Sequence, residues 1–127
     1  MTATPLKTKD LEATLEKKGI VLVDCWAPWC APCRAFAPIY DRVAEKHPDV
    51  TFTKVNVDEE PQIARAFGVR GIPTLVAFRD GVPLFSQAGM LPEPALEALV
   101  AEIKALDMDD VRRLIAEAEA KAHTEAR

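Results

Sequence analysis

The spacing of apolar residues along the chain alternates between the period of a strand and the period of a helix. Residues 20–25 form a β-branched run of strand length that is apolar on both faces until Asp24, which is typical of a central strand. Asp80-Gly81 separates two further apolar runs and predicts a tight hairpin turn between them. The other strands are predicted at residues 4–7 (confined to a sheet edge by Pro5), 51–57, 74–78 and 82–87.

Segments of helical spacing separate these strands. Residues 10–18 predict a short helix with Thr8 or Asp10 as its N-cap, and a longer helix that contains Pro38 ends at His47. Two more helices are predicted at residues 60–67, with Asp58 as the N-cap and Gly68 as the C-cap, and at residues 96–106. The order strand, helix, strand, helix, hairpin, helix predicts an α/β fold, in which helices cover both faces of a mixed sheet of four to five strands.

Size and charge narrow the class of protein. The chain of 127 residues has 49% hydrophobic and 28% charged residues, which suits one soluble domain. Its net charge of −4 argues against a nucleic-acid partner, because phosphate binding needs a basic face. The longest apolar run, residues 19–23, is too short to cross a bilayer, and the first residues lack the pattern of a secretory signal. We therefore expect a cytoplasmic monomer with no membrane partner.

The cysteines are the main candidates for chemistry. Cys30 and Cys33 form a C-x-x-C pair where a strand gives way to a helix, and the helix N-terminus would stabilise a thiolate there. Cys33, one helical turn on, can reach the sulfur of Cys30 and close a small disulfide ring. The alternative is a zinc site that uses Cys25, His47 or His123, but the sequence has no second ligand pair at zinc spacing. We expect a redox pair and no metal site.

An ordered set of motifs resembles the thioredoxin family. The matching segments are residues 21–34 (VLVDCWAPWCAPCR), Pro38, residues 54–58 (KVNVD), residues 67–75 (FGVRGIPTL), the Asp80-Gly81 turn and Gly89. The resemblance implies the thioredoxin fold for residues 1–106, the thioredoxin domain. Residues 107–127 are then a C-terminal extension with an extra helix.

The resemblance also implies roles for single residues. Cys30 would attack a substrate disulfide, and Cys33 would resolve the resulting mixed disulfide. Asp24 matches the family's buried acid, which moves a proton on or off Cys33, and Lys54 matches the lysine that tunes this acid. Burial should raise the pKa of Asp24, which suits proton transfer near neutral pH. Pro73 matches the family's cis-proline opposite the disulfide, which leaves backbone groups free to pair with an extended substrate segment.

A shallow apolar surface for substrate docking is expected around the cysteines. Its residues are predicted to be Trp29, Ala31, Pro32, Gly71, Ile72, Ala88 and Gly89. Ala31 departs from the family, which most commonly has glycine between the cysteines. The residues between the two cysteines distinguish reductants from oxidants and isomerases in this superfamily. The sequence therefore does not determine the reduction potential of the pair. Cys25 stands where the family usually has an apolar or aromatic residue; we expect a small buried hydrophobe, with a regulatory thiol as the alternative.

The segment after residue 106 continues past the usual end of the family. Residues 107–110 supply negative charge to a helix start. A narrow apolar stripe follows at Val111, Leu114, Ile115 and Ala118. This helix either docks on the domain, stays exposed and frays, or serves self-association or a partner.

The resemblance implies a thiol–disulfide oxidoreductase that reduces protein disulfides. It would hold no bound cofactor, and NADPH and FAD would act through a partner, thioredoxin reductase. One alternative is a thioredoxin-fold adaptor that binds without turnover, which would have no use for the resolving Cys33. Another is an oxidant or isomerase, against which Trp29, Pro32 and Arg34 argue because they are thioredoxin's own residues. An exported or membrane-tethered form is a third, weakened by the missing signal.

Overall fold

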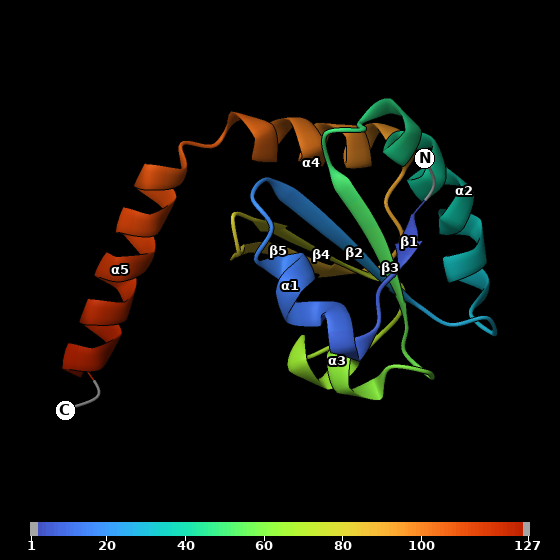
Figure 1. The fold of residues 1–127 in the computed structure, drawn as a ribbon, viewed down its shortest axis with the longest axis horizontal. Coiled ribbons are helices and arrows are strands. Elements are labelled where there is room, and N and C mark those ends of the chain that lie inside the picture. The colour runs from blue at the N-terminus through green and yellow to red at the C-terminus, as the bar shows by residue number, and fades with distance from the viewer. Residues whose placement is uncertain (1–2, 126–127) are drawn as a thin grey trace.

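A five-stranded mixed sheet forms the centre of the protein, whose computed structural model describes residues 3–125 (Figure 1). The strands are β1 (Thr4–Pro5), β2 (Ile20–Trp26), β3 (Thr51–Asn56), β4 (Thr74–Arg79) and β5 (Val82–Ala88). Their order in the sheet is β1-β3-β2-β4-β5, with β1, β3 and β2 parallel and with β4 and β5 antiparallel to their neighbours. The predicted mixed sheet is confirmed, and the short β1 lies at its edge.

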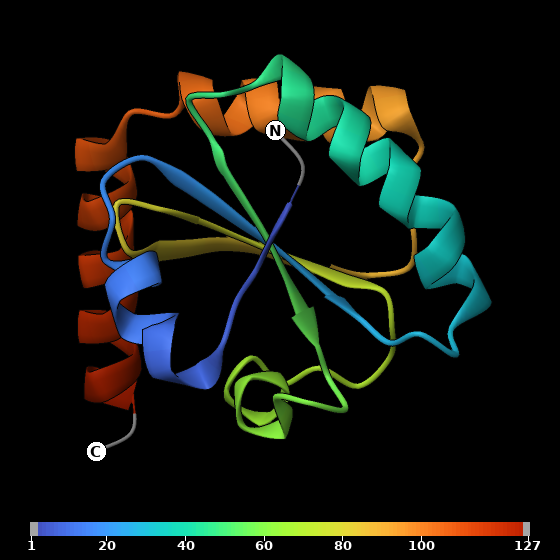
Figure 2. The same cartoon turned by 45° about the vertical axis from the view of Figure 1, so that its right-hand side comes forward.

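Helices cover both faces of this sheet (Figure 2). They are α1 (Leu11–Leu15), which follows the 3-10 turn η1 (Thr8–Asp10), α2 (Ala31–Lys46), α3 (Pro61–Ala66), α4 (Glu93–Ala105) and α5 (Met108–Glu125). Helices α2 and α4 lie on one face and α1 and α3 on the other, whereas α5 leads away from these layers. No helix in the described part of the chain is long and apolar enough to cross a membrane.

Two apolar clusters join the layers. Strand β2 contributes side chains to both clusters, because successive side chains of a strand point to opposite faces of the sheet. Leu22 packs under α2 and α4, whereas Val23 packs under α1 and α3. On the first face, the ring of Tyr40 lies 5.7 Å from that of Phe36 and 5.1 Å from that of Phe52. The buried Tyr40 hydroxyl donates to the backbone carbonyl of Thr53 over 2.7 Å, so its polar group is satisfied.

Two helix starts differ from the predictions. The helix expected over residues 10–18 spans only five residues after η1, and neither start has a side-chain cap hydrogen bond. Instead, the Glu60 carboxylate accepts the backbone N–H of Thr8 over 2.7 Å, a contact between residues 52 positions apart. Glu60, not Asp58, is the N-cap residue of α3, and Pro61 fills the first helical turn, where no donor is needed.

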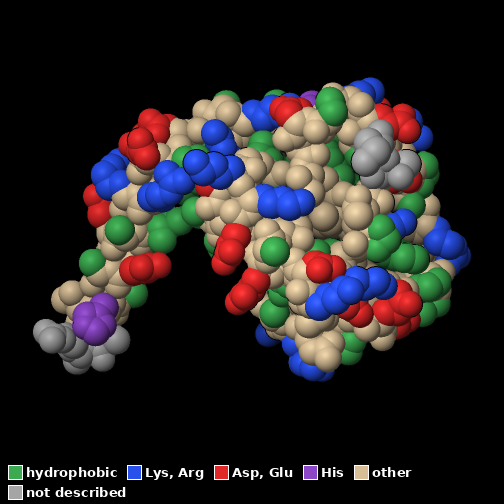
Figure 3. Space-filling view, in the orientation of Figure 1, with side chains coloured by type: hydrophobic (Ala, Val, Ile, Leu, Met, Phe, Trp, Pro, Cys, Tyr) green, Lys and Arg blue, Asp and Glu red, His purple; other side chains and the backbone are tan. Residues whose placement is uncertain are grey.

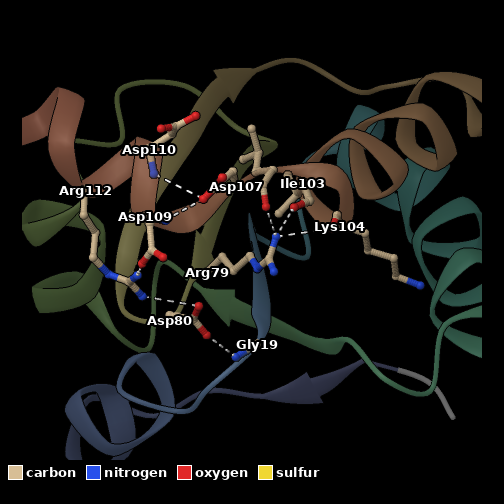
Figure 4. A network of polar contacts seen from close by, with 10 residues as sticks. Gly19, Arg79, Asp80, Ile103, Lys104, Asp107, Asp109, Asp110 and Arg112 are labelled. Atoms are coloured by element: carbon tan, nitrogen blue, oxygen red, sulfur yellow. Dashed lines mark hydrogen bonds and ion pairs between the residues drawn. The ribbon is translucent and has the colours of Figure 1, made fainter.

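The hairpin turn holds the C-terminal end of α4 (Figure 4). Arg79 donates from Nη1 to the backbone carbonyls of Ile103 over 2.7 Å, Lys104 over 3.3 Å and Leu106 over 3.0 Å. These carbonyls lie in the last turn of the helix and just beyond it, where the regular helical hydrogen bonds run out, although that of Ile103 also accepts the N–H of Leu106 over 3.3 Å. A side chain from the sheet therefore caps α4.

Replacing Arg79 with alanine is expected to lower the free energy of unfolding by about 1–3 kcal/mol, because it removes the charged donor from three carbonyls. Urea unfolding followed by circular dichroism measures the change. Arg113→Ala is the matched control, because among the described residues Arg113 pairs within the exposed α5 alone, with Asp110 and Glu117. That variant should stay within about 0.5 kcal/mol of the parent. Equal losses in both variants would contradict the capping role.

The next residue of the turn connects three segments. Asp80 and Gly81 both have positive φ, 53° and 81°, as a two-residue hairpin turn requires. The Asp80 carboxylate accepts the backbone N–H of Gly19 over 2.7 Å and lies 3.5 Å from the guanidinium of Arg112 on α5. Asp107 caps the start of α5 by accepting the N–H of Asp109 over 3.0 Å. The start of α5 is thereby held at the hairpin end of the sheet.

Candidate functional site

The cysteine pair lies at the junction between β2 and α2. Cys30 is the N-cap residue of α2, Cys33 lies in its first turn, and a disulfide joins them. The backbone N–H of Cys33 donates to the sulfur of Cys30 over 3.2 Å. Such a donor, together with the positive end of the helix dipole, favours a thiolate at Cys30 when the pair is reduced. Pro32 fits the first turn because no N–H is needed there.

Asp24 is a buried carboxyl group in the central strand. Its side chain belongs to β2 and is only 3% exposed, and burial raises its pKa from 3.8 to about 7. Lys54 opposes this shift from the paired position on β3, and Asp41 adds to it. Among the described residues, the Asp24 Oδ1 atom has no hydrogen-bond partner. The predicted buried acid is therefore in place, with a pKa near neutrality.

A small cavity joins Asp24 to the inner cysteine. It has a volume of about 80 Å³ and is lined by Asp24, Trp26, Cys33, Arg34, Ala37 and Lys54. The Lys54 ammonium lies over the Trp26 ring, 5.6 Å from its centre, so the face of the indole attracts and stabilises the cation. The volume is ample for a water molecule between the carboxyl group and the sulfur.

The predicted docking residues lie around the outer cysteine. Ile72 is half-buried, and the exposed ones are Trp29, Ala31, Pro32, Gly71, Ala88 and Gly89. The Trp29 side chain is 67% exposed, and its Nε1 donates to the carboxylate of Asp58 over 2.9 Å, which fixes the ring. The Ile72–Pro73 peptide bond is cis, as the resemblance implied, and the carbonyl oxygen of Ile72 lies 3.7 Å from the Cys30 sulfur.

Three further residues were not predicted from the sequence as members of the site. Met90 follows Gly89 and is 41% exposed, but it belongs to a loop whose spacing predicts nothing. Arg34 donates to the Pro28 carbonyl over 2.8 Å and lines the cavity. Asp58, expected to cap a helix, instead holds Trp29. Of these three, only Asp58 belongs to a motif that was noted, the KVNVD segment. Its hydrogen-bond partner, Trp29, lies 29 residues away in the sequence.

The remaining candidates lie outside this region. Cys25 is fully buried on the opposite face of the sheet, and burial raises the pKa of its thiol to about 12, which leaves almost no thiolate at neutral pH. His47, named above as an alternative zinc ligand, is half-buried, with Nε2 3.2 Å from the Glu97 carboxylate and Nδ1 2.9 Å from the Lys104 ammonium. Over residues 3–125, no three His, Cys, Asp or Glu side chains are grouped to hold a metal ion.

Comparison with known proteins assigns this geometry to a family. The sequence profile of the thioredoxin family matches residues 2–104. The chain belongs to the thioredoxin family. It is 44% identical to "Putative thioredoxin 2" of Streptomyces coelicolor over 96% of this chain and 92% of that one. It is also 48% identical to a thioredoxin of Alicyclobacillus acidocaldarius, over 65% of this chain and 80% of the relative.

Two solved structures have the same fold. A mutant thioredoxin from Halobacterium salinarum superimposes with a TM-score of 0.77 at 34% identity, covering 84% of this chain and 94% of that one. A second chain, at 30% identity and TM-score 0.72, covers 82% of this chain and 95% of that one. It comes from work on a yeast mitochondrial 1-Cys peroxiredoxin and the glutathione/thioredoxin systems.

The family membership settles the class of activity. The protein is a thioredoxin-type thiol–disulfide oxidoreductase, a protein-disulfide reductase whose active site is the Cys30–Cys33 pair. Thioredoxins carry no bound cofactor, in agreement with the sequence-based expectation.

Proposed function

We propose that Cys30 attacks the disulfide of a protein substrate and that Cys33 resolves the mixed disulfide. The observation that carries this assignment is that the two sulfurs face different surroundings. Cys30 touches the Ile72 carbonyl within the exposed docking surface, whereas Cys33 lines the inner cavity with Asp24. The Cys30 thiolate forms a bond to one substrate sulfur, and the other substrate sulfur leaves as a thiolate.

Asp24 supports the second step. As a carboxylate it accepts the Cys33 proton, through a water molecule in the cavity that they share. The Cys33 thiolate then attacks the Cys30 sulfur, the mixed disulfide breaks, and the second substrate thiol is released. Two electrons have passed from the dithiol to the substrate, and the Cys30–Cys33 disulfide remains. Lys54 limits how far burial raises the pKa of Asp24, and so keeps the acid available as a base near neutral pH.

The docking surface receives an extended segment of the substrate. Gly71, Ala88 and Gly89 are exposed and lack bulky side chains, so another backbone can approach closely. Pro73 is buried beneath them, and its carbonyl accepts the N–H of Gly89 over 2.8 Å, which ties the two loops together. The Ile72 backbone is then available for pairing with the substrate segment.

Thioredoxin reductase is proposed as the partner that returns two electrons to the pair, with NADPH and FAD acting in that partner. A reducing compartment such as the cytoplasm suits a dithiol that must be kept reduced. Residues 1–106 are proposed as the catalytic domain and residues 107–127 as an extension. Each chain carries a complete site, so one copy is sufficient for the reaction.

The reduction potential of the Cys30–Cys33 pair tests this function. We expect a midpoint of about −270 mV, the value of a disulfide reductant. Equilibration with a glutathione redox buffer or a reference thioredoxin measures it. The Ala31→Gly variant, which restores the residue most common in the family, is the matched control and should stay within about 30 mV of the parent. A parent midpoint between about −180 and −120 mV would indicate an isomerase or oxidant instead.

A further inference from the structure

Five large exposed apolar side chains mark two separate places on the protein. Trp29 (67% exposed) precedes Cys30, and Met90 (41%) follows Gly89, whose N–H donates to the Pro73 carbonyl. Leu106 (38%), Leu114 (56%) and Ile115 (37%) lie on α5 or just before it. The substrate surface accounts for the first pair, whereas the established activity has no use for the second group.

Helix α5 contacts its own domain only through its first turns. Met108 is buried and Val111 half-buried, but every described residue after Val111 is exposed. An open groove of about 360 Å³ separates the helix from the hairpin turn; its lining residues are Gly81, Val82, Pro83, Arg112, Ile115, Ala116 and Glu119. Figure 3 shows the second half of α5 standing clear of the domain, with a hollow between them and hydrophobic side chains along the helix.

The apolar stripe of α5 lies to one side of the face that lines the groove, and the two share Ile115. The stripe consists of Val111, Leu114, Ile115, Ala118 and Ala122, at helical spacing. The residues that line the groove, such as Arg112 and Glu119, lie about a quarter turn round the helix from this stripe. Most of the stripe, Leu114 above all, is therefore left uncovered by its own domain.

We propose that this stripe pairs with the same stripe of a second copy of the chain, with the two α5 helices antiparallel. In this register Leu114 packs against Ala118 of the second copy, and Val111 packs against Ala122. Each large side chain thereby meets a small one, so the helices can approach closely. The seam is symmetric, because every contact occurs twice about the twofold axis.

Charges beside the stripe favour its pairing with a second copy. Asp110 and Lys121 lie along one flank of the stripe, and Arg112 and Glu119 lie along the other. Antiparallel pairing brings Asp110 opposite Lys121 of the second copy and Arg112 opposite its Glu119. Parallel pairing would set the two different flanks against each other, which places Asp110 near Arg112 and Lys121 near Glu119 of the second copy. The charges therefore suit pairing of the stripe with itself in either orientation, and the match of large with small side chains selects the antiparallel one.

The dimer leaves both active sites open. Helix α5 is held at Asp80, just after β4 ends, whereas the Cys30 sulfur lies 3.7 Å from the carbonyl oxygen of Ile72, just before β4 begins. A single helix pair is small beside the roughly 1,200–2,000 Å² of stable interfaces, so the dimer forms only at high concentration. This inference replaces the monomer expected from composition.

Sedimentation velocity of the full chain over a concentration series up to about 1 mM tests the proposal. We expect the mass to rise from that of one chain toward that of two. Leu114→Glu should weaken dimerisation by at least about tenfold, because it places a charge in the apolar seam. Ala120→Glu is the matched control, because it adds the same charge to the opposite side of the same helix, and its dimerisation should equal that of the parent.

A charge exchange tests the orientation. Lys121→Glu should weaken the dimer because it faces Asp110 of the second copy, and the double variant Asp110→Lys/Lys121→Glu should restore it. A parent that stays monomeric throughout the series overturns the proposal, as does a dimer that Leu114→Glu leaves intact. If the double variant dimerises as weakly as Lys121→Glu alone, the antiparallel register is wrong. Disulfide reduction should be unchanged in all these variants, so this test is independent of the proposed catalytic roles.

Discussion

Replacing Cys30 with serine should lower the rate of protein-disulfide reduction at least about a thousandfold. A serine hydroxyl is not ionised at neutral pH, and its oxygen cannot form the mixed disulfide on which turnover depends. The helix N-terminus that favours a thiolate at this position cannot overcome so large a difference in acidity. NADPH consumption in the presence of thioredoxin reductase and a disulfide-containing protein measures the rate.

The matched variant is Cys33→Ser, which retains the attacking thiol and removes the resolving one. It should also stop turnover, but it should accumulate a covalent complex with the substrate, visible by mass spectrometry and lost on addition of dithiothreitol. Cys30→Ser should form no such complex. If Cys30→Ser still turned over, or if it formed the complex that Cys33→Ser lacked, the roles of the two cysteines would have to be reassigned.

Replacing Asp24 with asparagine should stabilise the oxidised protein at alkaline pH by up to about 4 kcal/mol. The pKa of this carboxyl group is about 7 in the folded chain, against 3.8 as an ordinary value. The folded state therefore holds the proton more tightly than the unfolded state does. As pH rises from 3.8 to 7 the unfolded state loses its proton first, so stability falls, and above pH 7 the full cost of the buried charge remains.

Urea unfolding of the two proteins at pH 4 and at pH 9 measures this effect. The asparagine variant should match the parent near pH 4, where the folded parent is protonated, and exceed it at pH 9. Asp10→Asn is the control, because Asp10 is exposed and makes no capping hydrogen bond, and it should change little at either pH. A gain of equal size at both pH values would mean that packing, not ionisation, is responsible.

Local signals accounted for much of the fold. The Asp80-Gly81 hairpin was predictable because two consecutive residues of these types adopt positive φ with little strain. Strand β2 was predictable from its β-branched run, and the adjoining cysteines placed the redox pair at the start of a helix. Asp24 was conspicuous as one carboxyl group in an apolar strand, and its burial follows from that strand's central place in the sheet.

Contacts between distant segments could not be read in this way. Asp58 was predicted to cap a helix, yet its carboxylate holds Trp29. Glu60 does lie at the start of α3, but its carboxylate accepts the backbone N–H of the distant Thr8. His47 bonds to α4 because two helices meet there, which no local pattern indicates. The loops around the disulfide come from separate parts of the chain, and only the resemblance to a family placed them together. The direction of α5 depends on Arg79 and Asp80, whose partners lie 24 or more residues away.

The redox site and the attachment of the C-terminal helices lie at opposite ends of β2. The cysteines follow the last residue of the strand, whereas α4 and α5 are fastened where the strand begins, about 20 Å away for a strand of seven residues. A bead, an electrode linker or a fused cargo protein attached after α5 would be joined to the protein at the end opposite the cysteines. The redox surface would still face outward, so the chain is suited to immobilised or tethered disulfide reduction.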